Sequence, residues 1–82
     1  MKRTVEHKGS YDAVDDKGQR HRINVYVEVM HVSTLSGPTQ RVEGLQTHKM
    51  ASNGGHVNVN DDGTVEEVST GRLMRPVSAM PA

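Results

Sequence analysis

The sequence contains no cysteine, no tryptophan and no phenylalanine, and two tyrosines are its only phenyl-bearing side chains. The lack of cysteine excludes disulfides and thiolate metal sites. Large aromatic rings usually dominate core burial, so their scarcity leaves valine, methionine and a few other aliphatic side chains to form the core. A thin core of β-branched residues, or burial by self-association, would satisfy this composition.

The chain also lacks an excess of either charge, because ten basic side chains balance ten acidic ones. Proteins that bind nucleic acids usually carry a basic excess or a basic face, and here only a local face is left to consider. No apolar run approaches the ~20 residues that span a bilayer, and no apolar segment follows Lys2 and Arg3 as it would in a signal peptide. These features predict a cytoplasmic protein without a membrane partner.

Turn signals recur along the chain at short, fairly even intervals. Glycine supplies the positive φ that such corners need, and Asn and Asp tolerate it. Short runs between regular turns are typical of an all-β meander, sandwich or small barrel, and 82 residues form one domain at most. The signals are Asp16-Lys17-Gly18, Ser36-Gly37-Pro38, Ser52-Asn53-Gly54-Gly55, Asp61-Asp62-Gly63 and Thr70-Gly71.

The clearest strand runs from Arg20 to Val32, where β-branched residues alternate with polar ones. A period of two over this length predicts a strand and not a helix. Shorter strands are expected at residues 11–15, 56–60, 64–69 and 72–75. The predicted core comprises the inward residues Ile23, Val25, Val27, Val29, Val57, Val59, Val65 and Leu73.

We therefore predict an all-β fold in which one small antiparallel sheet curls into an SH3-like roll or barrel over residues 10–75. Residues 1–9 are expected to be a partly disordered N-terminal segment, and residues 76–82 a disordered tail. The alternative is an α+β fold with one helix near residues 38–50, where Val42, Leu45 and Met50 have roughly helical spacing. Gly44 interrupts that helix, which favours strands on both sides of it.

Two patterns suggest a metal site but lack essential ligands. The segment from Asn58 to Ser69 matches the start of a calcium loop, yet Ser69 stands where a bidentate Glu is needed. The five histidines show no H-x-x-x-H or similar spacing. A two-residue Asn53-Gly54 loop would place His48 and His56 on opposite faces, whereas a three-residue loop would place both on one face. We predict no metal and no cofactor.

Catalytic patterns are equally weak. The serines fall at turns, at strand ends or in the tail, and none has the context of a nucleophile elbow. Glu66 and Glu67 are adjacent, so a strand would point them to opposite faces. A chain this small also has little room for an enclosed pocket of ~300–1,000 Å³. The sequence predicts a protein that is not an enzyme.

Several turn motifs follow one another in the second half of the chain: Gly44-Leu45, Asn53-Gly54, Val57-Asn58, Asp61-Asp62-Gly63-Thr64-Val65-Glu66 and Thr70-Gly71-Arg72-Leu73-Met74-Arg75. Their order resembles that in a group of short bacterial proteins of unknown function, which has a glycine-led strand, a DG-x-x-VN hairpin, a DDGTFE turn and a TG-x-x-L-x-R ending. The chain departs from the group at Val65 and His48, where the group tends to have Phe and Tyr. The resemblance implies a small bacterial β domain and no activity.

The candidate binding residues lie around the first predicted hairpin and its long strand: Lys17, Arg20, Arg22, Asn24 and Tyr26. We expect a non-enzymatic binding module that meets an unknown protein partner through a sheet edge or through the Tyr26 face. The alternative is a nucleic-acid-binding or regulatory protein, in which the cations contact a backbone and the tyrosine stacks on a base. A homodimer through an uncovered edge of the Arg20–Val32 strand is a further expectation.

Overall fold

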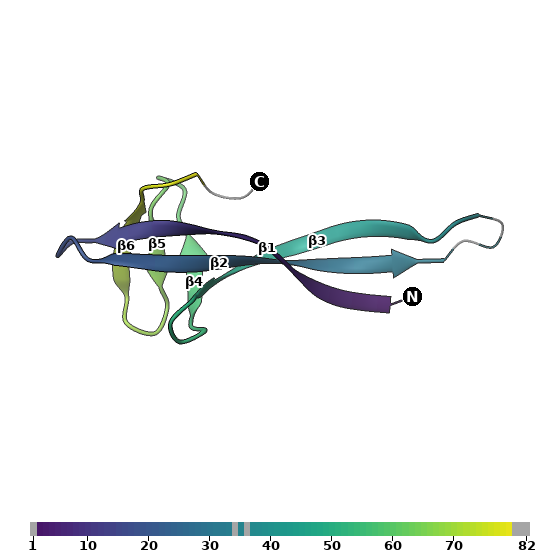
Figure 1. The fold of residues 1–82 in the computed structure, drawn as a ribbon, viewed down its shortest axis with the longest axis horizontal. Coiled ribbons are helices and arrows are strands. Elements are labelled where there is room, and N and C mark those ends of the chain that lie inside the picture. The colour runs from purple at the N-terminus through teal and green to yellow at the C-terminus, as the bar shows by residue number, and fades with distance from the viewer. Residues whose placement is uncertain (1, 34, 36, 80–82) are drawn as a thin grey trace.

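The computed structural model describes residues 2–33, 35 and 37–79, and its described residues contain six strands and no helix. Neighbouring strands pair antiparallel in chain order, and β1 also pairs with β6, which closes a barrel (Figure 1). The all-β prediction is confirmed, and the alternative helix near residues 38–50 is wrong because β3 occupies that stretch. The strands are β1 (Lys2–Asp15), β2 (Arg20–Val32), β3 (Gln40–Met50), β4 (His56–Val59), β5 (Val65–Glu67) and β6 (Arg72–Pro76).

The closed part of the barrel takes up one end of an elongated molecule that measures 56 × 22 × 20 Å. β6 pairs with β1 only at residues 13–15, and β4 pairs with β3 only at residues 48 and 49. Beyond those contacts β1, β2 and β3 continue together as a three-stranded ribbon, seen to the right in Figure 1. We call this ribbon the arm, and define it as residues 2–8, 27–32 and 40–46.

Two β-bulges mark the junction between the barrel and the arm. The β1–β2 register shifts between His7 and Gly9, and the β2–β3 register shifts between Val27 and Val29. In the second bulge Gly44 and Leu45 oppose one residue of β2. A bulge bends a strand and increases its twist, so these positions redirect the ribbon as it leaves the barrel. The predicted strands on both sides of Gly44 are confirmed, as one strand with a bulge.

Most of the predicted core residues are buried in the structure, but two of them are exposed. Six of the eight predicted core residues are buried, but Val59 is 47% and Leu73 56% exposed. The register pairs Met74 with Val65 and Leu73 with Glu66, so Met74, 2% exposed, points inward in place of Leu73. A slip of one residue reverses every side chain of a strand. The core cluster is Tyr11, Ala13, Ile23, Val25, Met50, Val57, Val65 and Met74.

The predicted boundaries of the domain are too narrow at the N-terminus. Residues 2–9 belong to β1 and pair along β2, from Lys2 opposite His31 onward, so a disordered N-terminal segment is wrong for them. These residues are mostly polar and lack the apolar alternation that identifies β2 in the sequence. At the other end Val77 N donates to Asp12 O at 2.9 Å, so the expected disorder does not begin at residue 76. Residues 80–82 lie outside the described residues.

The arm buries Val27 and Val29 without an apolar layer over them. Glu6 pairs with Val27 in the register and Glu43 with Val29, which places these carboxylates on the same face as the two valines. Arg41 Nη2 lies 2.7 Å from Glu6 Oε1, and Arg41 Nη1 lies 3.5 Å from Glu43 Oε2. The aliphatic stems of such side chains can cover apolar surface while their charged ends stay in water.

Candidate functional site

The structure places the five predicted site residues along one side of the molecule without gathering them. Arg20, Arg22, Asn24 and Tyr26 alternate with the buried residues of β2 and therefore face outward. Lys17 lies in the turn before β2. Six residues of strand span about 20 Å, so Arg20 and Tyr26 cannot contact the same small group.

Only part of this set is neutralised by neighbouring acids. Arg22 Nε lies 3.5 Å from Asp12 Oδ1, and among the described residues it is the one member of the set in an ion pair. Asp15, which lies close to Lys17 in the sequence, turns into the barrel and is buried. Asn24 Nδ2 donates to Tyr26 Oη at 3.5 Å.

Tyr26 lies in a groove on the outer face of the sheet, at the junction of barrel and arm. The groove has a volume of about 530 Å³ and is open to solvent. That volume falls within the ~300–1,000 Å³ of ordinary ligand sites. The lining residues are Val5, Tyr26, Glu28, Thr47, Lys49, Gly54 and His56.

The groove combines an aromatic surface with positive charge. Lys49 Nζ lies 5.8 Å from the centroid of the Tyr26 ring, which is within the range of a cation–π interaction. The His7 ring lies 5.4 Å from the same ring at an interplanar angle of 50°. Glu28 is held by Arg3 at 2.6 Å, so its charge is compensated from outside the groove. The arrangement suits an apolar or flat group next to an acidic one.

Sequence reasoning found Tyr26 but missed Lys49, His56 and His7. These residues come from three strands, and only the strand register brings them together: His7 opposes Tyr26, and Lys49 opposes both Asn24 and His56. The turn after β3 is neither the two-residue nor the three-residue loop, because residues 51–55 connect the strands and Met50 N donates to Gly55 O. Since His48 opposes Val57, its side chain and that of His56 face opposite sides of the sheet.

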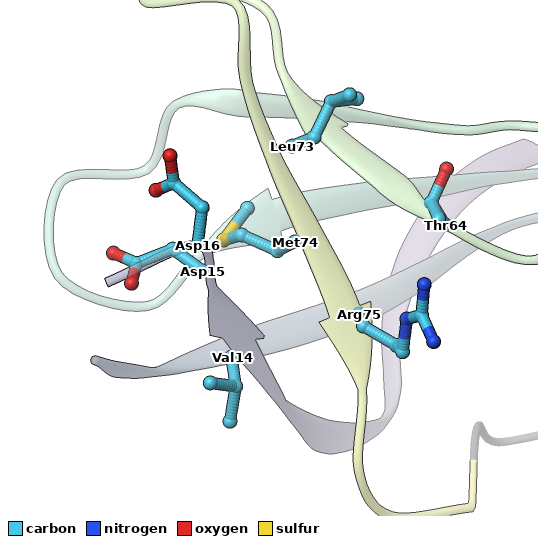
Figure 2. Close-up of a pocket in the computed structure, with 7 residues that line it drawn as sticks. All are labelled: Val14, Asp15, Asp16, Thr64, Leu73, Met74 and Arg75. Atoms are coloured by element: carbon cyan, nitrogen blue, oxygen red, sulfur yellow. The ribbon is translucent and has the colours of Figure 1, made fainter. Parts of the chain in front are cut away.

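A second pocket of about 250 Å³ lies between the end of β1 and β6 (Figure 2). Asp15 and Asp16 lie at one side of it, and Arg75 lies beside Thr64 at the other. Leu73 and Val14 point away from each other in this view. Its smaller volume and spread-out side chains make it a weaker candidate than the Tyr26 groove.

A buried Asp–His pair next to this pocket closes the first hairpin. Asp15 Oδ1 accepts hydrogen bonds from the backbone N–H groups of Lys17 and Gln19, each at 2.9 Å, and His21 Nε2 donates to Oδ2 at 3.0 Å. The hydrogen bond from His21 is the main reason why the pKa of Asp15 is lowered. Arg72 Nη1 also lies 3.9 Å from Oδ2. The contacts of Asp15 with its own turn, with β2 and with β6 fit a structural role.

A second histidine takes part in a polar pair inside the barrel. The Tyr11 hydroxyl and His48 Nδ1 are hydrogen-bonded at 2.8 Å, and the two rings meet edge to face with centroids 5.6 Å apart. Burial raises the pKa of Tyr11 to about 12 and lowers the pKa of His48. Both groups are therefore held in their neutral forms, as a buried pair requires.

The calcium-like segment forms the β4–β5 hairpin. Asp62 Oδ1 accepts hydrogen bonds from the Thr64 backbone N–H at 2.9 Å and from the Thr64 hydroxyl at 2.6 Å. One of its carboxylate oxygens is thus used within the turn. In the described part of the chain no three His, Asp or Glu side chains are arranged to hold a metal ion.

Comparison of the chain with known protein families, curated proteins and solved structures gives no match. The resemblance to short bacterial proteins therefore stays a prediction. Among residues 2–33, 35 and 37–79, no helix is long and apolar enough to cross a membrane.

Proposed function

We propose that this chain is a non-enzymatic binding module and that the Tyr26 groove is its ligand site. The observation that carries the proposal is the Tyr26 ring, set in an open groove of about 530 Å³ with Lys49 5.8 Å from its centroid. Ligand sites of this kind combine an apolar surface with a few convergent polar groups. A cytoplasmic location belongs to the same proposal, supported by the absence of cysteine.

The ligand that fits this chemistry is a peptide segment of a protein partner with an apolar or aromatic side chain next to an acidic one. Val5 and Tyr26 offer the apolar contact, while Lys49 and His56, which also line the groove, offer donors. Tyrosine is well suited to such contacts because its rigid ring loses little conformational entropy on binding.

The test is an NMR titration of the labelled protein with two synthetic peptides. One peptide carries aromatic and acidic residues, and the other is identical except that its acids are replaced by lysine. We expect saturable chemical-shift changes at Tyr26, Lys49 and His56 with the acidic peptide and none with the lysine peptide. Lys49→Glu should weaken binding by roughly tenfold or more, because a hydrogen bond to a charged group contributes about 1.5–3 kcal/mol.

Lys17→Glu is the matched control, since it makes the same charge change in a turn away from the groove and should leave affinity unchanged. Tyr26→Ala should also weaken binding, by removing the stacking surface. Equal binding of both peptides, or shifts that map away from the groove, would contradict the proposal.

A second candidate, single-stranded nucleic acid, is favoured by one observation: Arg20, Arg22 and Tyr26 all face outward from β2, and Lys49 lies near the ring. Each phosphate contact with a single strand would add about −0.7 to the slope of log affinity against log salt. We expect no such binding at physiological salt, because Arg22 is paired with Asp12 and net charge is zero. Sub-micromolar binding of an oligonucleotide, abolished by Arg20→Ala with Arg22→Ala, would promote this candidate.

A further inference from the structure

Two long edges of the sheet, which run mostly along the arm, pair with no described strand. One is the outer edge of β1 from Lys2 to Tyr11, and the other is the outer edge of β3 from Gln40 to Thr47. β2, whose edge the sequence suggested as a pairing surface, lies between them and is covered on both sides. An uncovered strand presents a row of N–H and C=O groups to any other strand. The two edges differ in the charges that they would present to a second copy of the chain.

The β3 edge is complementary to itself. When two copies pair antiparallel about Val42, Arg41 of each copy lies opposite Glu43 of the partner subunit, so two ion pairs form. A register shifted by two residues places Arg41 opposite Arg41 of the partner subunit, or Glu43 opposite Glu43 of the partner subunit. Registers shifted by one residue would exchange the faces of the sheet. Opposite charges across a strand pair stabilise it, and like charges destabilise it, so the charges select one register.

The exposed side chains at this edge are consistent with that register. Val42 is 47% and Leu45 79% exposed on the described surface. Pairing places Val42 beside Val42 of the partner subunit and buries both, which is favourable. The side chains of Arg41 and Glu43 are partly exposed despite their contacts within the arm, so a partner can reach them.

The β1 edge selects no single register. A register centred on Val5 places Arg3 opposite His7 of the partner subunit and brings Lys2 close to the partner's Lys8. Registers centred on Thr4 or on His7 place Glu6 opposite the partner's Lys2 or the partner's Lys8, but Glu6 already pairs with Arg41 within the arm at 2.7 Å. The bulge between His7 and Gly9 also interrupts this edge. The β3 edge is therefore the one whose charges favour one register of two copies of this chain.

We propose that two copies of this chain associate through the β3 edges of their arms, in an antiparallel ladder over residues 40–44 centred on Val42. β1, β2 and β3 of each copy then form one continuous sheet. The bulge at Gly44 and Leu45 ends the ladder, which keeps the interface small. Thr47 and Lys49 lie beyond the ladder, so the dimer leaves the Tyr26 groove free and does not depend on the proposed function.

The test uses two charge variants, neither of which should dimerise alone, although a mixture of the two should form a dimer. Arg41→Glu gives a chain with Glu at both positions, and Glu43→Arg gives a chain with Arg at both positions. Each variant alone should be monomeric by sedimentation at concentrations of about 1 μM to 1 mM, which bracket weak and moderate association. Mixed in equal amounts, the two variants should form a heterodimer, because every pair in the ladder is again of opposite charge.

The wild type should dimerise over the same concentrations, and Lys2→Glu, which makes the same charge change at the β1 edge, should dimerise equally well. Recovery in the mixture also shows that the arms of both variants are folded. A wild type that stays monomeric to 1 mM, a single variant that dimerises like the wild type, or a mixture that stays monomeric would overturn the proposal.

Discussion

The barrel and the arm share the same three strands but bury their valines in different ways. In the barrel, Val25 lies among apolar side chains contributed by other strands, such as Val65 and Met74. In the arm, Val29 is equally inaccessible, yet the groups that share its face include Glu6, Arg41 and Glu43. The barrel is closed by β4–β6, whereas polar side chains lie opposite the buried valines of the arm. Thr4 and Glu43 oppose Val29, and Glu6 and Gln46 oppose Val27.

The comparison shows how far a small chain can extend a sheet beyond its core. A three-stranded ribbon with one apolar face is close to the minimum for stability. Ion pairs between exposed side chains contribute little and are screened by salt. The barrel should therefore set the global stability, and the arm should open locally at lower free energy.

The largest effect is expected in the barrel core. Val25→Asp should abolish cooperative folding, because a charge buried without a partner is very costly. Circular dichroism melting would show this as the loss of a sigmoidal transition. Val59→Asp, at an exposed position of β4, should keep a transition close to that of the wild type. A normal transition for Val25→Asp would mean that the barrel core is placed incorrectly.

The next effect separates the two candidate core residues of β6. Met74→Ala should lower the free energy of unfolding by about 2–5 kcal/mol, as large-to-small core substitutions do. Leu73→Ala should cost less than about 1 kcal/mol, since an exposed side chain loses little buried area. Urea denaturation measures both. The opposite ranking would show that β6 has the register expected from the sequence and not the one in the structure.

A smaller effect follows from the polar pair within the barrel. The pKa of His48 is lowered in the folded state, so the folded protein binds fewer protons than the unfolded chain as pH falls. Stability from this group is complete above the ordinary histidine pKa of about 6.5 and is lost as pH falls below it.

His48→Gln should flatten the decline of the melting temperature as pH falls below the ordinary histidine pKa of about 6.5. Gln46→Ala, which removes no titratable group, should leave the decline unchanged. The lowered pKa of Asp15 acts in a separate window, with stability that is present above the ordinary carboxyl value and lost as pH falls through the lowered one. An unchanged decline in His48→Gln would contradict the role of the Tyr11–His48 pair.

The smallest effect concerns the arm alone. At 1 M salt the screening length falls to about 3 Å, so amide hydrogen exchange at Val29 and Val42 should become faster relative to exchange at Val25. Arg41→Gln should produce a similar acceleration at low salt. Exchange should be measured at protein concentrations too low for dimerisation, so that the rates report on the monomer. Equal responses of barrel and arm would show that the ion pairs do not hold the arm together.

Much of the fold follows from local patterns in the sequence. The alternation of β2 correctly identifies Ile23, Val25, Val27 and Val29 as buried, because a strand points successive side chains to opposite faces. Several predicted turns are supported by positive φ at Gly18, Gly54, Gly63 and Gly71, which side-chain-bearing residues rarely adopt. The Tyr26 face was also recognisable, since an outward ring on a strand full of inward valines is unusual.

Tertiary structure decided what depends on pairing between distant residues. The polar start of β1 forms a strand because β2 supplies hydrogen-bond partners from Tyr26 to His31, which no local pattern in residues 2–8 reveals. Met74 replaced Leu73 in the core because the register of β6 against β5 was set by the closed barrel. Likewise, Lys49 lies near Tyr26 only through the β2–β3 register. Local sequence determines which residues alternate, but pairing determines which alternation faces inward and which side chains from different strands meet.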